Sequence, residues 1–122
     1  MERHWKYSFA EPPEIVPFSF GEAPVNEGET SVIMCNIKRG DKPVSITWSL
    51  KGDVVSSDPA LTTSMIGTQI SLLTITNVGY RHSGTYTCRA TNQAGSVTYS
   101  TNLLVNGTDY CHALETFYLQ IL

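Results

Sequence analysis

Short runs of β-branched and aromatic residues follow one another between about Pro13 and Val105, and clusters of Gly, Asn, Asp, Ser and Pro separate them. This pattern is typical of a sheet protein. No segment predicts a helix, and no connection is long enough to hold a crossover helix, so we predict an all-β sandwich of antiparallel strands. The seven predicted strands cover residues 14–20, 30–37, 44–50, 61–65, 69–76, 84–91 and 96–105.

The two ends of the chain differ from this middle. With 122 residues, of which 41% are hydrophobic, the chain can build one core and hardly two. Pro12 and Pro13 stiffen the entry to the first strand. We therefore expect one domain over residues 12–107, a head outside the domain over residues 1–11, and a poorly ordered tail over residues 108–122.

The charge of the chain disfavours two classes of partner. The formal net charge is -3, and the 8 basic and 11 acidic side chains are scattered without a basic stripe. This pattern disfavours binding to nucleic acid or to a membrane surface. No apolar run approaches the ~18 residues of a membrane span, and no secretory signal follows the first residues. We expect any signal or anchor to lie outside this chain.

Two cysteines, a tryptophan and a tyrosine are spaced as in an immunoglobulin sandwich: Cys35, Trp48, then Tyr86 two positions before Cys88. Residues 73–96, "LTITNVGYRHSGTYTCRATNQAGS", resemble the pattern of intermediate-set (I-set) immunoglobulin domains of cell-adhesion molecules. The resemblance implies a Cys35–Cys88 disulfide, with Trp48 packed on it and the Tyr86 hydroxyl bonded to the backbone. Such a bridge implies an extracellular, oxidising location. The alternative is two buried thiols in a cytosolic domain of muscle type.

The chain departs from the I-set pattern at one position, His82, where an Asp usually pairs with a basic side chain across the bottom of the sandwich. We interpret His82 as a harmless surface corner rather than a pH switch.

A narrower resemblance covers residues 12–107. The segments "PPEIVPFSFGE", "KRGDKPVSITW" and "TQISLLTI" are similar to the seventh immunoglobulin domain of arthropod Down syndrome cell adhesion molecule (Dscam), or to its counterpart in the shortened chelicerate forms. In that family alternative exons encode this domain, and its identity decides which isoforms bind each other. The resemblance implies an identical domain as partner, in an antiparallel homodimer through the sheet of the first, second, fifth and fourth strands, and neighbouring immunoglobulin domains in a cell-surface receptor.

Strand alternation identifies which side chains that sheet turns outward. On the second strand Cys35 faces inward, and on the fifth strand Leu73 and Ile75 face inward, provided that the fifth strand runs straight back to Ile70. The outward residues are the candidate homophilic interface, because a contiguous apolar patch often marks an interface, although scattered surface aliphatics are also ordinary. This set is Val32, Met34, Asn36, Ile70, Leu72 and Thr74.

Two short motifs lie at strand ends. Arg39-Gly40-Asp41 matches an integrin attachment sequence, but it falls between the second and third strands, where Gly followed by Asp is ordinary turn chemistry. We interpret it as a turn. Asn106-Gly107-Thr108 is an acceptor sequence for N-glycosylation, and Asn106 is a candidate glycosylation site.

Nothing in the sequence predicts catalysis. His4, His82 and His112 fall in the head, at a strand corner and in the tail, and none has an inward carboxylate or nucleophile placed beside it in the sequence pattern. Cys111 and His112 are adjacent and lack the spacing of a zinc site. We therefore expect no enzymatic activity, no metal and no cofactor. The alternatives to homophilic adhesion are a structural spacer domain and heterophilic binding of an integrin or immune ligand.

Overall fold

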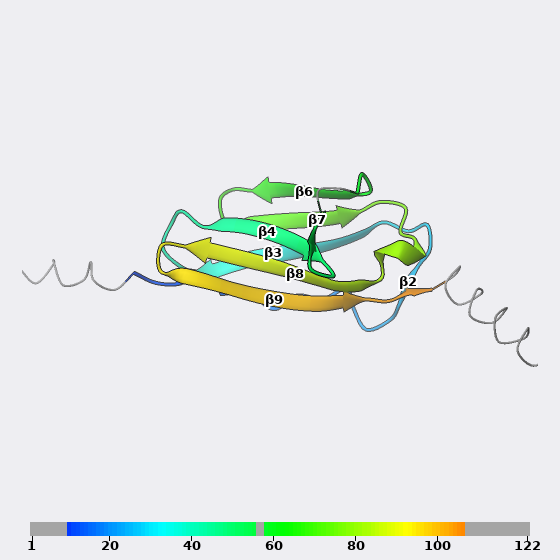
Figure 1. Ribbon diagram of the computed structural model, residues 1–122, viewed down its shortest axis with the longest axis horizontal. Helices are drawn as coiled ribbons and strands as arrows, with labels where there is room; N and C mark the ends of the chain where they lie inside the picture. Colours follow the sequence, from blue (N-terminus) through cyan, green and yellow to red (C-terminus); the bar gives the residue numbers. More distant parts are fainter. Residues whose placement is uncertain (1–9, 56–57, 107–122) are drawn as a thin grey trace, which may run out of the picture.

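The computed structural model describes residues 10–55 and 58–106, which form two antiparallel sheets packed face to face (Figure 1). The first sheet has the order β1 (Glu14–Ile15), β3 (Ser31–Arg39), β7 (Ile70–Ile75) and β6 (Leu61–Ile66). The second has the order β5 (Asp53–Val54), β4 (Ser45–Leu50), β8 (Gly84–Asn92) and β9 (Gly95–Leu103). A short parallel pair joins β2 (Val25–Asn26) to β10 (Val105–Asn106). The predicted all-β sandwich is confirmed.

The structure differs from the predicted elements mainly at short pieces. The first predicted strand, residues 14–20, is reduced to Glu14–Ile15, and Pro17, which has no N–H to donate to a ladder, lies just beyond it. Strands β2 and β5 have two residues each, too few to show a period of two. The last predicted strand, residues 96–105, is divided into β9 and the two-residue β10. One turn of 3₁₀-helix, η3 (Tyr80–His82), was not predicted.

The centre of the core is the disulfide that the family resemblance implied. The Sγ atoms of Cys35 on β3 and Cys88 on β8 are bonded at 2.00 Å, so the bridge links the two sheets. Trp48 lies opposite Cys88 in the β4-β8 register, and its Nε1 donates a hydrogen bond of 2.9 Å to Oγ of buried Ser71. This bond satisfies two polar groups that burial would otherwise penalise. The predicted core residues Leu73, Ile75 and Tyr86 are also fully buried.

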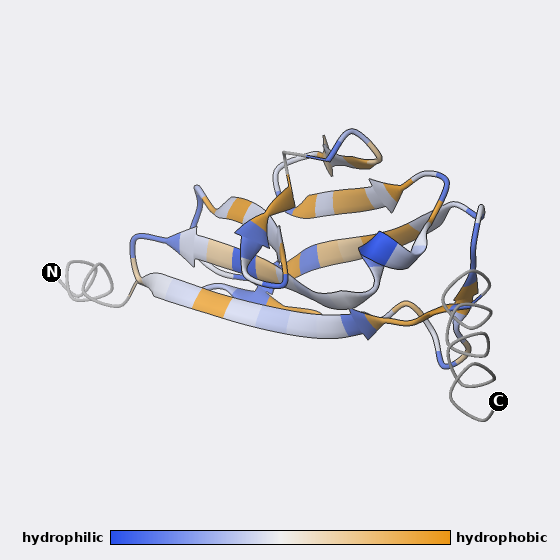
Figure 2. Ribbon diagram, turned by 45° about the vertical axis from the view of Figure 1, so that its right-hand side comes forward, coloured by the Kyte–Doolittle hydropathy of each residue, from blue (hydrophilic) through white to orange (hydrophobic). Residues whose placement is uncertain are grey.

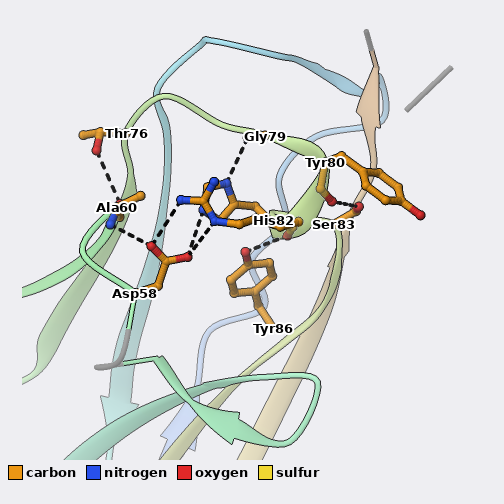
Figure 3. Close-up of polar contacts among 9 residues, drawn as sticks. Asp58, Ala60, Thr76, Gly79, Tyr80, His82, Ser83 and Tyr86 are labelled. Carbon is orange, nitrogen blue, oxygen red and sulfur yellow. Dashed lines mark hydrogen bonds and ion pairs between the residues drawn. The ribbon is translucent and has the colours of Figure 1, made fainter. Parts of the chain in front are cut away.

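The interpretation of His82 as a surface corner is wrong, because its side chain is fully buried. Figure 3 shows its polar contacts with Asp58 and Gly79. The Gly79 N–H donates to Nδ1 of His82 at 2.9 Å, so the ring proton sits on Nε2, which lies 3.2 Å from Oδ2 of Asp58. Arg81 also donates to Asp58, and the Tyr86 hydroxyl donates to the His82 carbonyl at 2.7 Å. Asp58 and His82 therefore fasten the start of β6 to the turn before β8.

The same contacts move two pKa values. Burial, together with the charge of Arg81, lowers the pKa of His82 below its usual 6.5, although Asp58 acts in the opposite direction. Protonation would also place a hydrogen on Nδ1, directly against the Gly79 N–H. The hydrogen bond from the Ala60 N–H, together with Arg81, lowers the pKa of Asp58 below 3.8. The folded protein thus favours a neutral His82 and an ionised Asp58.

We expect the free energy of unfolding to decrease as the pH falls from 7 to 5. Because the folded-state pKa of His82 is depressed, the unfolded chain takes up its proton first, so stability is complete above about 6.5 and is lost below it, by about 1.4 kcal/mol per unit of depression. Asp58 adds a second loss below 3.8. Urea unfolding at several pH values measures both. The variant His82→Gln keeps the other two histidines, and an equally steep decrease in that variant between pH 7 and 5 would contradict the assignment to His82.

Candidate recognition face

Three strands of the first sheet align their outward side chains in rows across the sheet. The middle row is Met34 on β3, Leu72 on β7 and Ser64 on β6. Residues opposite each other on antiparallel strands point to the same side, so the row on one side is Asn36, Ile70 and Ile66, and the row on the other is Val32, Thr74 and Thr62. We call these residues the β3-β7-β6 face. None of them is charged.

An apolar band runs diagonally across this face, from Val32 at one corner through Met34, Leu72 and Ile70 to Ile66 at the other. The two ends and Met34 are open to solvent, with exposed fractions of 51% for Val32, 42% for Met34 and 53% for Ile66, whereas Leu72 and Ile70 are half-buried between them. Exposed large aliphatic side chains of this kind lose contact with water only when another surface covers them.

The structure places all six residues of the sequence-predicted interface on the β3-β7-β6 face. The β3-β7 register continues without a shift from the Ser31–Ile75 pair to the Asn36–Ile70 pair, so the straight fifth strand assumed above is present. The contribution of β6 to this face, namely Thr62, Ser64 and Ile66, was not predicted. These residues point to the opposite side of the strand from buried Leu61, and this alternation could have identified them as outward. The predicted strand, however, stopped one residue before Ile66.

The outward face of the second sheet is different in kind, because it carries hydroxyl and amide side chains around the exposed Arg89. Side-chain hydrogen bonds connect Thr85 to Asn102 at 2.6 Å, Thr87 to Ser100 at 2.7 Å, and Thr91 to Ser96 at 2.8 Å across β8 and β9. Figure 2 shows the long β9 strand mostly in pale colours, with little orange. This sheet therefore already satisfies many of its outward polar groups, as expected of a face that stays in water.

The residues of the integrin-like motif make contacts within the domain. Arg39 Nε lies 3.3 Å from Oε1 of Glu14. Gly40 has φ 138°, and a Cβ there would lie 2.7 Å from Cα of Pro13, so only glycine fits. The Asp41 carboxylate accepts a hydrogen bond from the Glu11 N–H at 3.1 Å, while the Asp41 N–H donates to the Glu11 carbonyl at 2.9 Å. The motif thus holds the entry of the chain against the β3-β4 turn.

The remaining predicted sites lie partly or wholly outside the described residues. Asn106 is exposed at the end of β10, whereas Gly107 and Thr108 of its acceptor sequence lie outside the described residues, so glycosylation stays a prediction. His4, Cys111 and His112 also lie outside them. In the described part of the chain, no three His, Cys, Asp or Glu side chains are grouped so that they could hold a metal ion. No helix within the described ranges is long and apolar enough to cross a membrane.

The fold, the inter-sheet disulfide and the tyrosine that returns its hydroxyl to the backbone together define an immunoglobulin sandwich. A family model described as "Immunoglobulin domain" matches residues 12–92. The chain belongs to the immunoglobulin domain family.

Within that family, the chain is similar to Dscam proteins. It is 38% identical over 96 residues to Cell adhesion molecule Dscam1 of Drosophila melanogaster, an alignment that covers 78% of this chain and 5% of that protein. It is 37% identical over 94 residues to human Cell adhesion molecule DSCAML1, covering 77% of this chain and 4% of that one. The chain therefore spans about 5% of the length of these relatives.

A solved structure agrees with these relatives. The crystal structure of the Dscam1 Ig7 domain, isoform 5, superposes with a TM-score of 0.77 at 36% identity and covers 80% of this chain and 100% of that one. The similarity to the seventh immunoglobulin domain of Dscam that the sequence indicated is thus confirmed.

Proposed function

We propose that this chain is an extracellular cell-adhesion module that binds a second copy of itself through the β3-β7-β6 face. The observation that carries the proposal is the apolar band on the uncharged β3-β7-β6 face, opposite a sheet whose outward side carries hydroxyl, amide and guanidinium groups. The Cys35–Cys88 disulfide suits an oxidising, extracellular location. Relatives named as cell adhesion molecules support the same role, with neighbouring immunoglobulin domains in one receptor as further partners.

The β3-β7-β6 face is suited to a two-fold contact between identical copies. A self-complementary patch must tolerate its own chemistry, and a face without charged residues brings no like charges together. In an antiparallel arrangement the apolar band would supply affinity at the centre. The polar side chains around the band, Asn36, Thr74 and Thr62, would supply selectivity, because a mismatched copy leaves their hydrogen-bonding groups unpaired.

Bead sorting tests both self-binding and selectivity. Beads of one colour carry this chain, and beads of another colour carry the Dscam1 Ig7 domain. We expect beads that carry this chain to cluster with each other and to exclude the second colour. Beads that carry the variant Val32→Glu/Met34→Glu, here called the face variant, should cluster far less, because two buried carboxylates would oppose the contact.

A matched control separates this result from a general effect of charge. Ser45→Glu/Thr47→Glu, the control variant, adds the same two charges at exposed positions on the outward side of β4. Its beads should cluster as the unchanged chain does. Equal clustering of the face variant, or mixing of the two colours, would contradict selective homophilic binding and would favour a spacer or heterophilic role.

A further inference from the structure

Strand β6 forms one edge of the first sheet, because it pairs with β7 on one side and with no strand on the other within the described residues (Figure 1). Natural sheets protect such edges with charged side chains, proline, bulges or very short strands. β6 has six residues, Leu-Thr-Thr-Ser-Met-Ile, without a charge or a proline, and its register to β7 shows no shift. It is therefore an open edge of high β-propensity.

The other edges of the two sheets are shorter or covered. β1 and β5 have two residues each and carry Glu14 and Asp53. β9 has nine residues and also lacks charge, but the entry of the chain lies beside it: β1 contacts β9, the Phe18 ring packs on Tyr99 at 4.9 Å between ring centroids, and β2 pairs with β10 just beyond the end of β9. Among the described residues, β6 is therefore the longer charge-free edge without a chain end packed along it.

The backbone groups that β6 offers follow from its pairing with β7. The Thr76 N–H donates to the Ala60 carbonyl at 3.0 Å, and bonded pairs alternate along an antiparallel ladder. Thr62, Ser64 and Ile66 therefore bond to β7, whereas Thr63 and Met65 direct their N–H and C=O groups away from the sheet. The Leu61 N–H, which has the same orientation, is already bonded to the Asp58 carbonyl at 3.0 Å.

We infer that β6 is a second self-association surface, at which β6 of another copy pairs with it antiparallel across a two-fold axis at Ser64. In that register Thr63 of each copy lies opposite Met65 of the other, so all the free N–H and C=O groups of these two residues find partners. In this register the edge is self-complementary, and the pairing brings no like charges together. Both properties favour a second copy over a charged or unrelated strand.

A groove beside this edge completes the contact. It has a volume of about 390 Å³, lies between β6 and the β4-β5 hairpin, and is lined by Ile46, Trp48, Val54, Val55, Leu61 and Met65. Thr63 and Met65 point to the groove side, since they share the orientation of buried Leu61. Met65 of the second copy, placed opposite Thr63, would lie over this groove and cover Met65 and Val54, which are 49% and 65% exposed.

This surface is distinct from the proposed recognition face, because pairing at the edge uses the backbone of Thr63 and Met65 rather than the outward side chains of β3 and β7. The test therefore uses the full chain with Cys111→Ser, to prevent covalent dimers, in two backgrounds: with the face intact and with the face variant. In the face variant we expect a dimer at high concentration by sedimentation equilibrium. The amides of Thr63 and Met65 should exchange with deuterium at least about tenfold more slowly at high than at low concentration.

Two substitutions at the edge should remove that dimer. Met65→Lys places a charge in the pairing, and Thr63→Pro removes a free N–H without removing a bond to β7. Each should lower the association constant of the face variant at least about tenfold, while Thr98→Lys on β9 should leave it unchanged. If the face variant is monomeric and its Thr63 and Met65 amides show no added protection, the edge contact is overturned, and the proposed function stands on its own evidence.

Discussion

Reduction of the Cys35–Cys88 disulfide is expected to lower the free energy of unfolding by about 4 kcal/mol. The bridge joins residues separated by 53 positions, and on a chain-entropy estimate a loop of this size restricts the unfolded chain by about that amount. Small domains have stabilities of about 5–15 kcal/mol, so the reduced protein should be close to unfolding at physiological temperature.

Thermal unfolding with and without a reductant measures this effect. At about 4–8 °C per kcal/mol for a domain of this size, the melting temperature should fall by roughly 15–30 °C. The comparison is made on Cys111→Ser, so that the reductant acts only on the pair that links the sheets. Melting temperatures that agree within about 2 °C would show that packing around Trp48 and Leu73, rather than the bridge, holds the sheets together.

The substitution His82→Asp, which restores the residue that the I-set pattern usually has here, is expected to destabilise this protein by about 3 kcal/mol at pH 7. His82 is fully buried beside Asp58. A carboxylate in its place would put two negative charges together and leave the Gly79 N–H without its present acceptor. Because the repulsion raises the pKa of the pair, stability of this variant should increase as the pH falls toward 5, opposite to the wild type.

The double variant Asp58→Arg/His82→Asp is the decisive control for this corner. It gives the corner a basic side chain that faces an acidic one, and it should recover most of the lost stability. The single variant Asp58→Arg should itself be less stable than the unchanged protein, because it sets a second guanidinium against that of Arg81. Urea unfolding of the four proteins gives the coupling energy. Additive effects of the two substitutions would contradict a direct interaction between positions 58 and 82.

The sequence was sufficient wherever one buried residue and the two-residue alternation of a strand determine the direction in which the other side chains point. Cys35 fixed the orientation of Val32, Met34 and Asn36, because side chains on a strand alternate strictly. Leu73 and Ile75 fixed the orientation of β7 in the same way. Family spacing then indicated the pairing of the cysteines, which the structure confirms.

The sequence was insufficient where a residue depends on a partner that no periodicity connects to it. The burial of His82 depends on Asp58, a loop residue 24 positions earlier. The Glu11 carbonyl likewise accepts a hydrogen bond of 2.7 Å from the side chain of Asn92, 81 positions later. Ile66 was missed because hairpin ends follow local turn geometry, and the charge-free edge of β6 became visible only when its neighbour on one side was known.

Sedimentation equilibrium of the Cys111→Ser chain, up to about 100 micromolar because one small interface can be weak, tests homophilic recognition most directly. The chain with the unchanged face and the control variant on β4 should both show concentration-dependent self-association, and the face variant should associate at least about tenfold more weakly with an unchanged melting temperature. A wild-type chain that stays monomeric over this range, or a face variant that associates as tightly as the control, would contradict recognition through the β3-β7-β6 face.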